Sequence, residues 1–241
     1  MSDSPATDEK KLQDRLKQEA GISSVDLIRP GMVLGLGSGS TTKFALIEIA
    51  ARLKDGRLKD IVGIPSSKDT EKTARELGIP LTSFDEKQEL DLTIDGADEV
   101  DPELNLIKGG GGALLREKVL AQSSRRNVMI VDESKLSPAL GTHFPVPVEV
   151  IPFAWKPVAN FLVSLGAEPV LRMKDDGTPY TTDQNNYIID SKFGPIRNLN
   201  DLALKLGQRA GIAEFGLFIG TASEVIVATS HGIRYQKRKD S

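Results

Sequence analysis

Cysteine is absent from this 241-residue sequence, and histidine occurs only as His143 and His231. The first absence excludes disulfide bonds, thiolate nucleophiles and sulfur-bound zinc sites. Two histidines cannot form a multi-histidine metal site, and a histidine base would have to be one of these two. Acid–base chemistry near neutral pH is therefore expected to use mainly carboxylates and lysines.

An excess of positive charge is also lacking, because the formal net charge is −3. This balance argues against broad nucleic-acid binding, which needs a basic face to neutralise phosphates. It leaves room for a local group of lysines around a small phosphorylated ligand. Residues 1–20 are polar and acid-rich, without the apolar core of a signal peptide or membrane span and unlike a transit sequence. We therefore expect a soluble, cytoplasmic protein with no nucleic-acid or membrane partner.

The first half of the chain alternates between strand and helix signals. Short apolar runs predict buried strands, and apolar positions at helical spacing predict the helices between them. This alternation predicts an α/β fold, a Rossmann-like parallel sheet flanked by helices on both faces, whose ligands bind at the carboxyl ends of the strands. The predicted strands are 32–36, 60–65, 90–94 and 127–131, and the predicted helices are 10–28, 41–54, 67–77 and 113–122.

The pattern changes after Asp132, where four prolines punctuate the segment 144–158. A smaller α+β domain is predicted as an insert at 144–212, within a main α/β catalytic domain formed by 1–143 and 213–241. Its predicted elements are helices 158–165 and 199–206, with strands 169–173 and 187–190. Two further strand candidates, 216–219 and 224–228, are expected to return to the first sheet.

A glycine loop, Gly-Leu-Gly-Ser-Gly-Ser-Thr at 35–41, follows the first strand. Glycines allow close backbone approach, Ser38, Ser40 and Thr41 add hydroxyl groups, and the next helix presents unpaired N–H groups, a combination that binds phosphate. The loop is not a Walker motif. It is a poor dinucleotide fingerprint, because the third glycine comes one position early and no acidic residue ends the second strand. A plain strand-to-helix turn is the alternative.

An acidic segment, 95–101, follows the third strand. Asp95 stands at the strand's carboxyl end, and Gly96 and Ala97 keep the loop compact, so Asp95 and Asp98 can point into one space. A solvated acidic turn is the alternative interpretation. A calcium loop would need the alternating ligands of an EF-hand, which this segment does not have, while a magnesium site stays open.

Lys108 precedes four successive glycines, 109–112, which are costly to order and indicate positive φ angles or close backbone approach. Glu117 lies in the opening turns of the following helix, where it can face the sheet end. The alternatives are a flexible glycine linker and a surface ion pair for Glu117. Lys135, after the fourth strand, is either a cation for a phosphate or an ordinary surface lysine.

Taken together, these motifs closely resemble the ribose-5-phosphate isomerase family of the A type. The resemblance spans nearly the whole chain in family order. It departs at Ser38, where the family commonly has threonine, and at Ala222-Ser-Glu224, where many members have Ala-Asp. The motifs that carry it are 35–41, 67–70, 77–80, 95–102, 108–118, 147–150, 152–154, 183–186 and Asp190.

The resemblance implies a role for each candidate residue. Ser38, Gly39, Ser40, Thr41 and Lys135 would hold substrate groups, including the phosphate. Glu117 would be the catalytic base, acting without a metal or cofactor on a small sugar phosphate in the pentose phosphate pathway or in carbon fixation. The family usually forms homo-oligomers, often dimers. The residues lining the sugar would be Asp95, Gly96, Ala97, Asp98, Lys108, Gly109, Gly110 and Gly111.

The mechanistic hypothesis is aldose–ketose exchange through an enediolate. Glu117 would carry a proton between adjacent carbons, and Asp95 would handle hydroxyl protons and ring opening. Lys108 would stabilise the oxyanion, with Asp98 orienting it or binding the sugar, and amides of the glycine run would assist. Three alternatives stay open: a non-catalytic sugar-phosphate sensor, a relative of acyl-CoA transferases with a glutamate nucleophile, and a metal-dependent phosphosugar enzyme. Whether Lys17 also contacts the phosphate is open as well.

Overall fold

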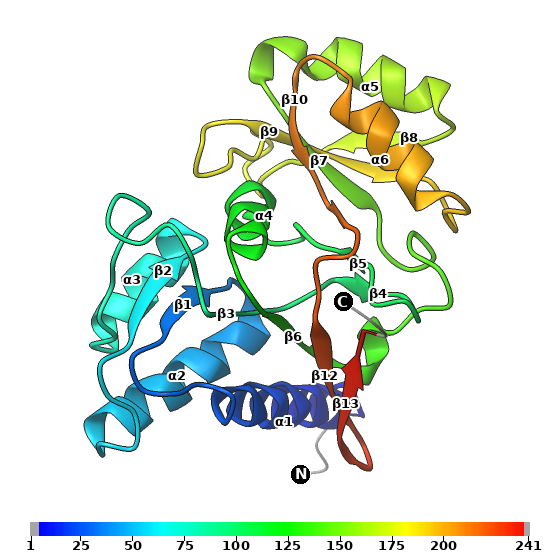
Figure 1. Ribbon diagram of the computed structural model, residues 1–241. Helices are drawn as coiled ribbons and strands as arrows, with labels where there is room; N and C mark the ends of the chain where they lie inside the picture. Colours follow the sequence, from blue (N-terminus) through cyan, green and yellow to red (C-terminus); the bar gives the residue numbers. More distant parts are fainter. Residues whose placement is uncertain (1–4, 239–241) are drawn as a thin grey trace. The chain divides into compact units, whose positions relative to one another are not determined.

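The computed structural model describes residues 5–238, which form two compact units (Figure 1). Within the described residues, unit 1 comprises 5–96, 120–135 and 222–238, and unit 2 comprises 97–119 and 136–221. Residues 1–4 and 239–241 of the predicted main domain lie outside the described residues. The predicted insert, 144–212, falls within unit 2, which also contains 97–119, 136–143 and 213–221.

Unit 1 is built on a six-stranded sheet in the order β13-β12-β6-β3-β1-β2. Every neighbouring pair is parallel except β12 and β13, which form an antiparallel edge. All residues of β6 and β12 are buried, as expected for central strands of a parallel sheet. The Rossmann-like fold class is confirmed. The strands are β1 (Val33–Leu36), β2 (Val62–Pro65), β3 (Leu92–Asp95), β6 (Asn127–Asp132), β12 (Glu224–Thr229) and β13 (Gly232–Lys237).

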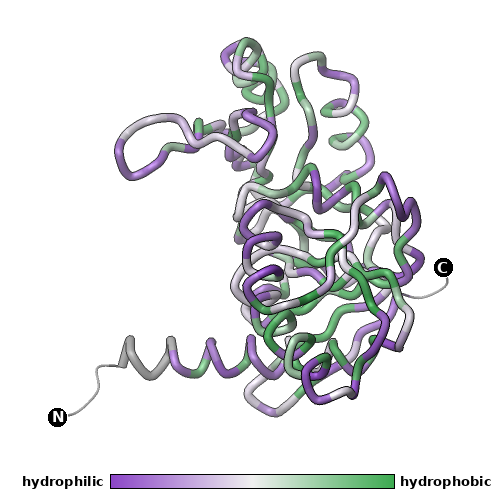
Figure 2. The backbone as a smooth tube through the Cα atoms, turned by 90° about the vertical axis from the view of Figure 1, so that its left-hand side faces the viewer, coloured by the Kyte–Doolittle hydropathy of each residue, from purple (hydrophilic) through white to green (hydrophobic). Residues whose placement is uncertain are grey.

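Three α-helices lie entirely within the described residues of unit 1: α1 (Pro5–Val25), α2 (Ser40–Lys54) and α3 (Lys68–Glu76). Helix α1 packs on α2 and on strands β6 and β12, and Figure 2 shows hydrophilic bands recurring along it. The two helices approach closely at Gly21, where an added Cβ would lie 2.9 Å from the Cβ of Phe44. Helix α3 begins as predicted, because the Ser67 side chain accepts a hydrogen bond from the Thr70 amide.

Unit 2 contains a four-stranded antiparallel sheet, β10-β7-β9-β8, and a small three-stranded sheet, β11-β5-β4. Its core combines valines of β7 with Val158, Leu162 and Leu206 of two helices. The elements are β4 (Glu99–Val100), β5 (Leu106–Ile107), β7 (Val146–Val150), β8 (Glu168–Leu171), β9 (Tyr187–Lys192), β10 (Ile212–Phe215), β11 (Leu217–Phe218), η2 (Pro152–Ala154), α5 (Trp155–Ser164) and α6 (Leu199–Gly207). Helix α4 (Leu114–Gln122) begins in unit 2 and ends in unit 1, and η1 (Glu133–Lys135) follows β6 in unit 1.

One strand prediction is wrong. The segment 216–219 does not return to the first sheet, because β11 pairs antiparallel with β5 in the three-stranded sheet of unit 2. All four paired residues are buried, so this short strand adds two apolar side chains to the interior of unit 2. The prediction for 224–228 is confirmed, since β12 lies parallel to β6. In the described residues, no helix has the length and apolar character required to cross a bilayer.

Glu99 connects β4 to the loop that precedes β7. It is completely buried, and its carboxylate accepts hydrogen bonds from the backbone amides of Gly141, Thr142, His143 and Phe144 at 2.8–3.3 Å. A buried carboxylate with several amide donors is a structural anchor, because those amides would otherwise lose their partners.

We predict that Glu99→Ala lowers the free energy of unfolding by about 3 kcal/mol, since buried amide donors are left without an acceptor. Urea unfolding followed by circular dichroism would measure the change. Glu103→Ala, at an exposed position of the same segment, is the control and should unfold like the parent protein. Equal stability of the two variants would contradict the anchoring role.

Candidate active site

The glycine loop and Asp95 meet in unit 1. Strands β1 and β3 are parallel neighbours, so the residues that follow them lie at one edge of the sheet. The amide of Gly37 donates to the carbonyl of Ile94 at 3.0 Å. Asp95 is almost completely buried, and its Oδ1 accepts from the amides of Ser38 and Gly96 at 3.1 and 2.7 Å. The carboxylate therefore holds the loop in place through backbone groups.

The structure explains why two positions of this loop are glycine. A Cβ on Gly37 would lie 2.2 Å from Oδ1 of Asp95, so no larger residue fits there without movement. Gly39 has φ of 101°, a conformation that side chains disfavour. It begins α2 without a side-chain cap, and the first N–H groups of a helix have no partner within it. This end of α2 is therefore suited to an anion.

The Ser38 hydroxyl belongs to a cluster of hydroxyl groups. Its Oγ lies 2.8 Å from Oγ of both Ser66 and Ser67 and 3.0 Å from Oγ1 of Thr70. Thr70 also donates to the carbonyl of Gly37 at 3.0 Å. Ser38 was predicted to contact the ligand, whereas no role in this loop was predicted for Ser66 and Thr70. The signal that could have found them is topological, because β1 and β2 are parallel neighbours whose following loops meet.

A pocket of about 250 Å³ opens beside this loop. Ser40 lies exposed at its edge, and Thr41 is half-buried in the first turn of α2. Lys135 is half-buried in η1, three residues after the end of β6, the strand next to β3. Lys17 is half-buried on α1. The pocket is lined by Gly37, Gly39, Ser40, Lys43, Leu46, Asp69, Thr70 and Thr73.

A second group of predicted residues meets in unit 2, around the β4–β5 hairpin. The amide of Asp98 donates to the carbonyl of Ile107 at 2.9 Å, so Asp98 and Lys108 lie at the same end of this hairpin. Oδ2 of Asp98 accepts from the amide of Gly110 at 2.7 Å. A Cβ on Gly110 would lie 2.6 Å from the other carboxylate oxygen, which explains the glycine. Ala97 is half-buried at the start of this segment.

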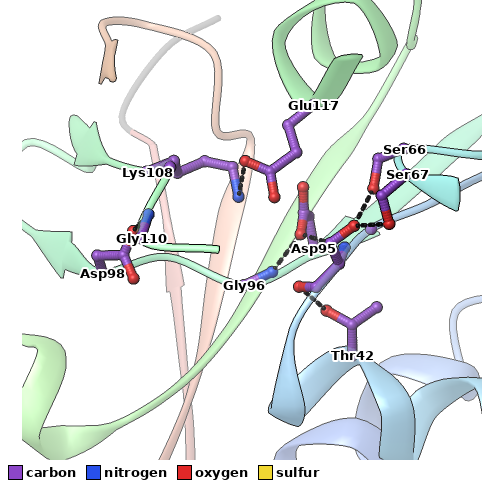
Figure 3. Close-up of polar contacts among 12 residues, drawn as sticks. Thr42, Ser66, Ser67, Asp95, Gly96, Asp98, Lys108, Gly110 and Glu117 are labelled. Carbon is purple, nitrogen blue, oxygen red and sulfur yellow. Dashed lines mark hydrogen bonds and ion pairs between the residues drawn. The ribbon is translucent and has the colours of Figure 1, made fainter. Parts of the chain in front are cut away.

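Lys108 and Glu117 form a buried ion pair (Figure 3). Nζ of Lys108 lies 3.3 Å from Oε2 of Glu117, and the two side chains are only 4% and 7% exposed. Surface ion pairing, the alternative interpretation of Glu117, is therefore wrong. Charged groups this deeply buried are rare unless they are paired. A buried carboxylate beside a buried ammonium group is equipped to accept a proton and to stabilise negative charge on an adjacent oxygen.

The four glycines are held by hydrogen bonds and are not a flexible linker. Nη1 of Arg172 donates to the carbonyls of Gly109 and Gly110, both at 3.0 Å, and Nε of Arg172 donates to Asp190 at 2.8 Å. Tyr180 donates to the carbonyl of Gly111 at 3.3 Å. Gly109 has φ of 106°. Arg172 was not predicted from the sequence, because a single arginine just after a strand carries no local signal of what it contacts.

The rest of the acidic segment is structural. Asp101 accepts from the amides of Glu103 and Asn105 and from the Asn105 side chain at 2.8–3.0 Å. In the part of the chain that the structure describes, no three histidine, aspartate or glutamate side chains form a group that could hold a metal ion. The predicted residues thus form two groups, one in each unit. One carries a loop suited to an anion, and the other has the acid–base pair of an enzyme that transfers protons.

Comparison with known proteins agrees with this class. The family model for ribose 5-phosphate isomerase A (phosphoriboisomerase A) matches residues 62–232. Ribose-5-phosphate isomerase A of Desulfatibacillum aliphaticivorans is 56% identical, over 93% of this chain and 98% of the relative. The Chloroflexus aurantiacus protein of the same name is 55% identical, over 93% and 94%. A solved D-ribose-5-phosphate isomerase in complex with phospho-erythronic acid is 40% identical with a TM-score of 0.92, over 93% and 99%. The chain belongs to the ribose 5-phosphate isomerase A family.

We predict that Gly110→Ala lowers the free energy of unfolding by about 1–3 kcal/mol, because the new methyl group would overlap the Asp98 carboxylate. Gly111→Ala is the matched control: its φ is not positive, and nothing lies within 4 Å of the added atom. It should unfold within about 0.5 kcal/mol of the parent protein. Urea unfolding measures both, and similar losses in the two variants would contradict the close approach of Asp98.

Proposed function

We propose that this chain interconverts D-ribose 5-phosphate and D-ribulose 5-phosphate through an enediolate, with Glu117 as the proton-shuttling base. The observation that carries the proposal is the buried pair of Lys108 and Glu117, 3.3 Å apart. The names of the relatives support the substrate, and the reaction needs only proton transfer. A cytoplasmic location and a homodimer stay predictions.

The proposed chemistry assigns one step to each side chain. The Glu117 carboxylate removes the proton from C2 of open-chain ribose 5-phosphate, and the C–H electron pair forms the double bond between C1 and C2. Negative charge then develops on the C1 oxygen, where the Lys108 ammonium stabilises it. Proton exchange between the two oxygens, assisted by Asp95, places the carbonyl at C2. Glu117 returns its proton to C1, which completes the exchange without net oxidation.

The phosphate is assigned to the amides of 39–41 at the start of α2, with Lys135 as a further cation, because the Ser38 amide already donates to Asp95. Backbone N–H groups and the positive end of the helix dipole favour this binding. The solved relative contains a phosphorylated sugar acid, which supports a site for a sugar phosphate in this family. Asp98 and the amides of Gly109 and Gly111 are assigned to the hydroxyl groups of the sugar, because the Gly110 amide already donates to Asp98.

The proposal assigns Asp95 and Asp98 to the same substrate molecule. The two residues are three positions apart in the sequence, so their Cα atoms lie within about 11 Å of each other. Only Gly96 and Ala97 separate them in the sequence.

We expect Glu117→Gln to lower kcat by about 10²–10⁴-fold, because the amide cannot accept the proton. The assay follows ribulose 5-phosphate formation from ribose 5-phosphate with EDTA present. Glu76→Gln, on the exposed surface of α3, is the control. Normal turnover by Glu117→Gln would exclude Glu117 as the base. A parent protein that is inactive with and without EDTA would favour a sensor or a CoA-transferase relative. A parent protein that is active only when EDTA is left out would indicate a metal-dependent enzyme.

Lys135→Ala is expected to raise KM about tenfold with little change in kcat, because it removes a cation from the phosphate in both the ground state and the transition state. Lys72→Ala, at a position 75% exposed, controls for the loss of positive charge elsewhere. Steady-state kinetics at two salt concentrations would measure the effect, which should weaken at high salt. An unchanged KM would exclude Lys135 from the phosphate site.

A further inference from the structure

Lys118, the residue after Glu117, is buried although no step of the proposed reaction uses it. Its side chain is 8% exposed. Nζ lies 2.6 Å from Oε1 of Glu214 and donates to the carbonyl of Phe215, also at 2.6 Å. Burial lowers the pKa of Lys118, and the Glu214 carboxylate opposes that change. A buried ion pair of this kind adds little net stability, because the cost of desolvation offsets the attraction between the two charges.

The same ammonium group contacts two aromatic rings. Nζ of Lys118 lies 4.2 Å from the ring centroid of Phe215 and 4.8 Å from that of Phe218. Nζ of Lys108 lies 5.6 Å from the Phe218 centroid. Both distances to Phe218 are within the range of cation–π attraction. One buried ring is therefore in reach of the ammonium proposed for catalysis and of the ammonium of Lys118.

The segment 214–218 also holds the backbone of Lys108. The amide of Lys108 donates to the carbonyl of Gly216 at 2.9 Å, and β11 pairs with β5, which ends one residue before Lys108. A Cβ on Gly216 would lie 2.2 Å from the carbonyl oxygen of Lys108, so this contact is close. The segment 214–218 thus contacts the chain beside each residue of the proposed catalytic pair. It accepts a hydrogen bond from the backbone of Lys108, and it binds the side chain of Lys118, which follows Glu117.

We propose that Lys118 is a positioning residue, which fixes the Glu117 carboxylate relative to the Lys108 ammonium by locking α4 onto the segment 214–218. This inference rests on the proposed function of Lys108 and Glu117. It assigns Lys118 no contact with the substrate. Removing the charge of Lys118 should therefore displace Glu117 relative to Lys108 and leave the affinity for the substrate phosphate unchanged.

The test compares Lys118→Met, which keeps the length of the side chain, with Lys72→Met on the exposed surface of α3. A displacement of about 1 Å at the reacting groups can reduce turnover by about 100-fold. Lys118→Met should therefore lose about 100-fold in kcat with KM unchanged, while Lys72→Met keeps the kcat of the parent. The folded fraction of each variant, measured by circular dichroism, corrects the values of kcat.

The pH profile of kcat separates positioning from a loss of folded protein. The charged groups around Lys118 are Glu214, Lys108 across Phe218 and the neighbouring Glu117, with Glu149 opposite Glu214 in the strand register. Removing a positive charge makes nearby groups bind protons more tightly, so both limbs of the profile should move to higher pH in Lys118→Met. Glu214→Gln removes a negative charge and should move them to lower pH.

The double variant, Lys118→Met with Glu214→Gln, keeps the net charge of the pair. Its profile should return toward that of the parent, while its kcat stays low because the lock between α4 and 214–218 is still lost. Glu214→Gln alone retains Lys118 and provides the same test if Lys118→Met does not fold: it should lose kcat, with KM unchanged.

Two outcomes would overturn the positioning role. One is a kcat for Lys118→Met, or for Glu214→Gln where the former does not fold, within twofold of the parent. The other is a loss explained entirely by the unfolded fraction, with an unmoved pH profile. Both leave the proposed isomerase function intact. A parent protein without isomerase activity would instead refute the proposed function, and the positioning role with it.

Discussion

Removing the ammonium of Lys108 and the carboxylate of Glu117 from water costs several kcal/mol for each group unless the two stay close and well held. Their separation of 3.3 Å satisfies that requirement. Several elements of unit 2 hold the two residues of this pair in place. The β4–β5 hairpin and β11 hold the backbone of Lys108, Arg172 holds the glycine run, and helix α4 presents Glu117.

Glycine and aspartate are paired in both groups of site residues. Gly37 is required by Asp95, and Gly110 is required by Asp98, because in each case the carboxylate occupies the space of a missing Cβ. Each aspartate also accepts a hydrogen bond from a loop amide. The glycines thus give the carboxylates close access to backbone donors, and the carboxylates in turn order segments that are expensive to order.

Much of the fold was predictable, because local signals determined it. The short apolar runs at 32–36 and 127–131 predicted buried strands, and Ser67 predicted the start of a helix; the structure confirms all three. The strand β7 was obscured by Pro147, which cannot donate a backbone hydrogen bond. Pro147 is tolerated because its carbonyl accepts from the Gly216 amide, while the Gly216 carbonyl takes its hydrogen bond from the Lys108 amide. The placement of β11 was wrong, since a two-residue strand contains too little pattern to indicate its partner.

The order of motifs along the chain was enough to determine the fold class, the family and the candidate side chains, because glycine runs, strand ends and charged residues are visible locally. Tertiary structure alone decided which charges are buried and what they contact. Glu99, Asp98 and Asp101 look alike in one acidic segment, yet Glu99 anchors a loop more than 40 residues away while Asp98 holds Gly110. Lys118 and Lys108 likewise meet one phenylalanine ring about a hundred residues later in the chain. Such contacts depend on long-range packing and burial, and no local spacing in a sequence encodes them.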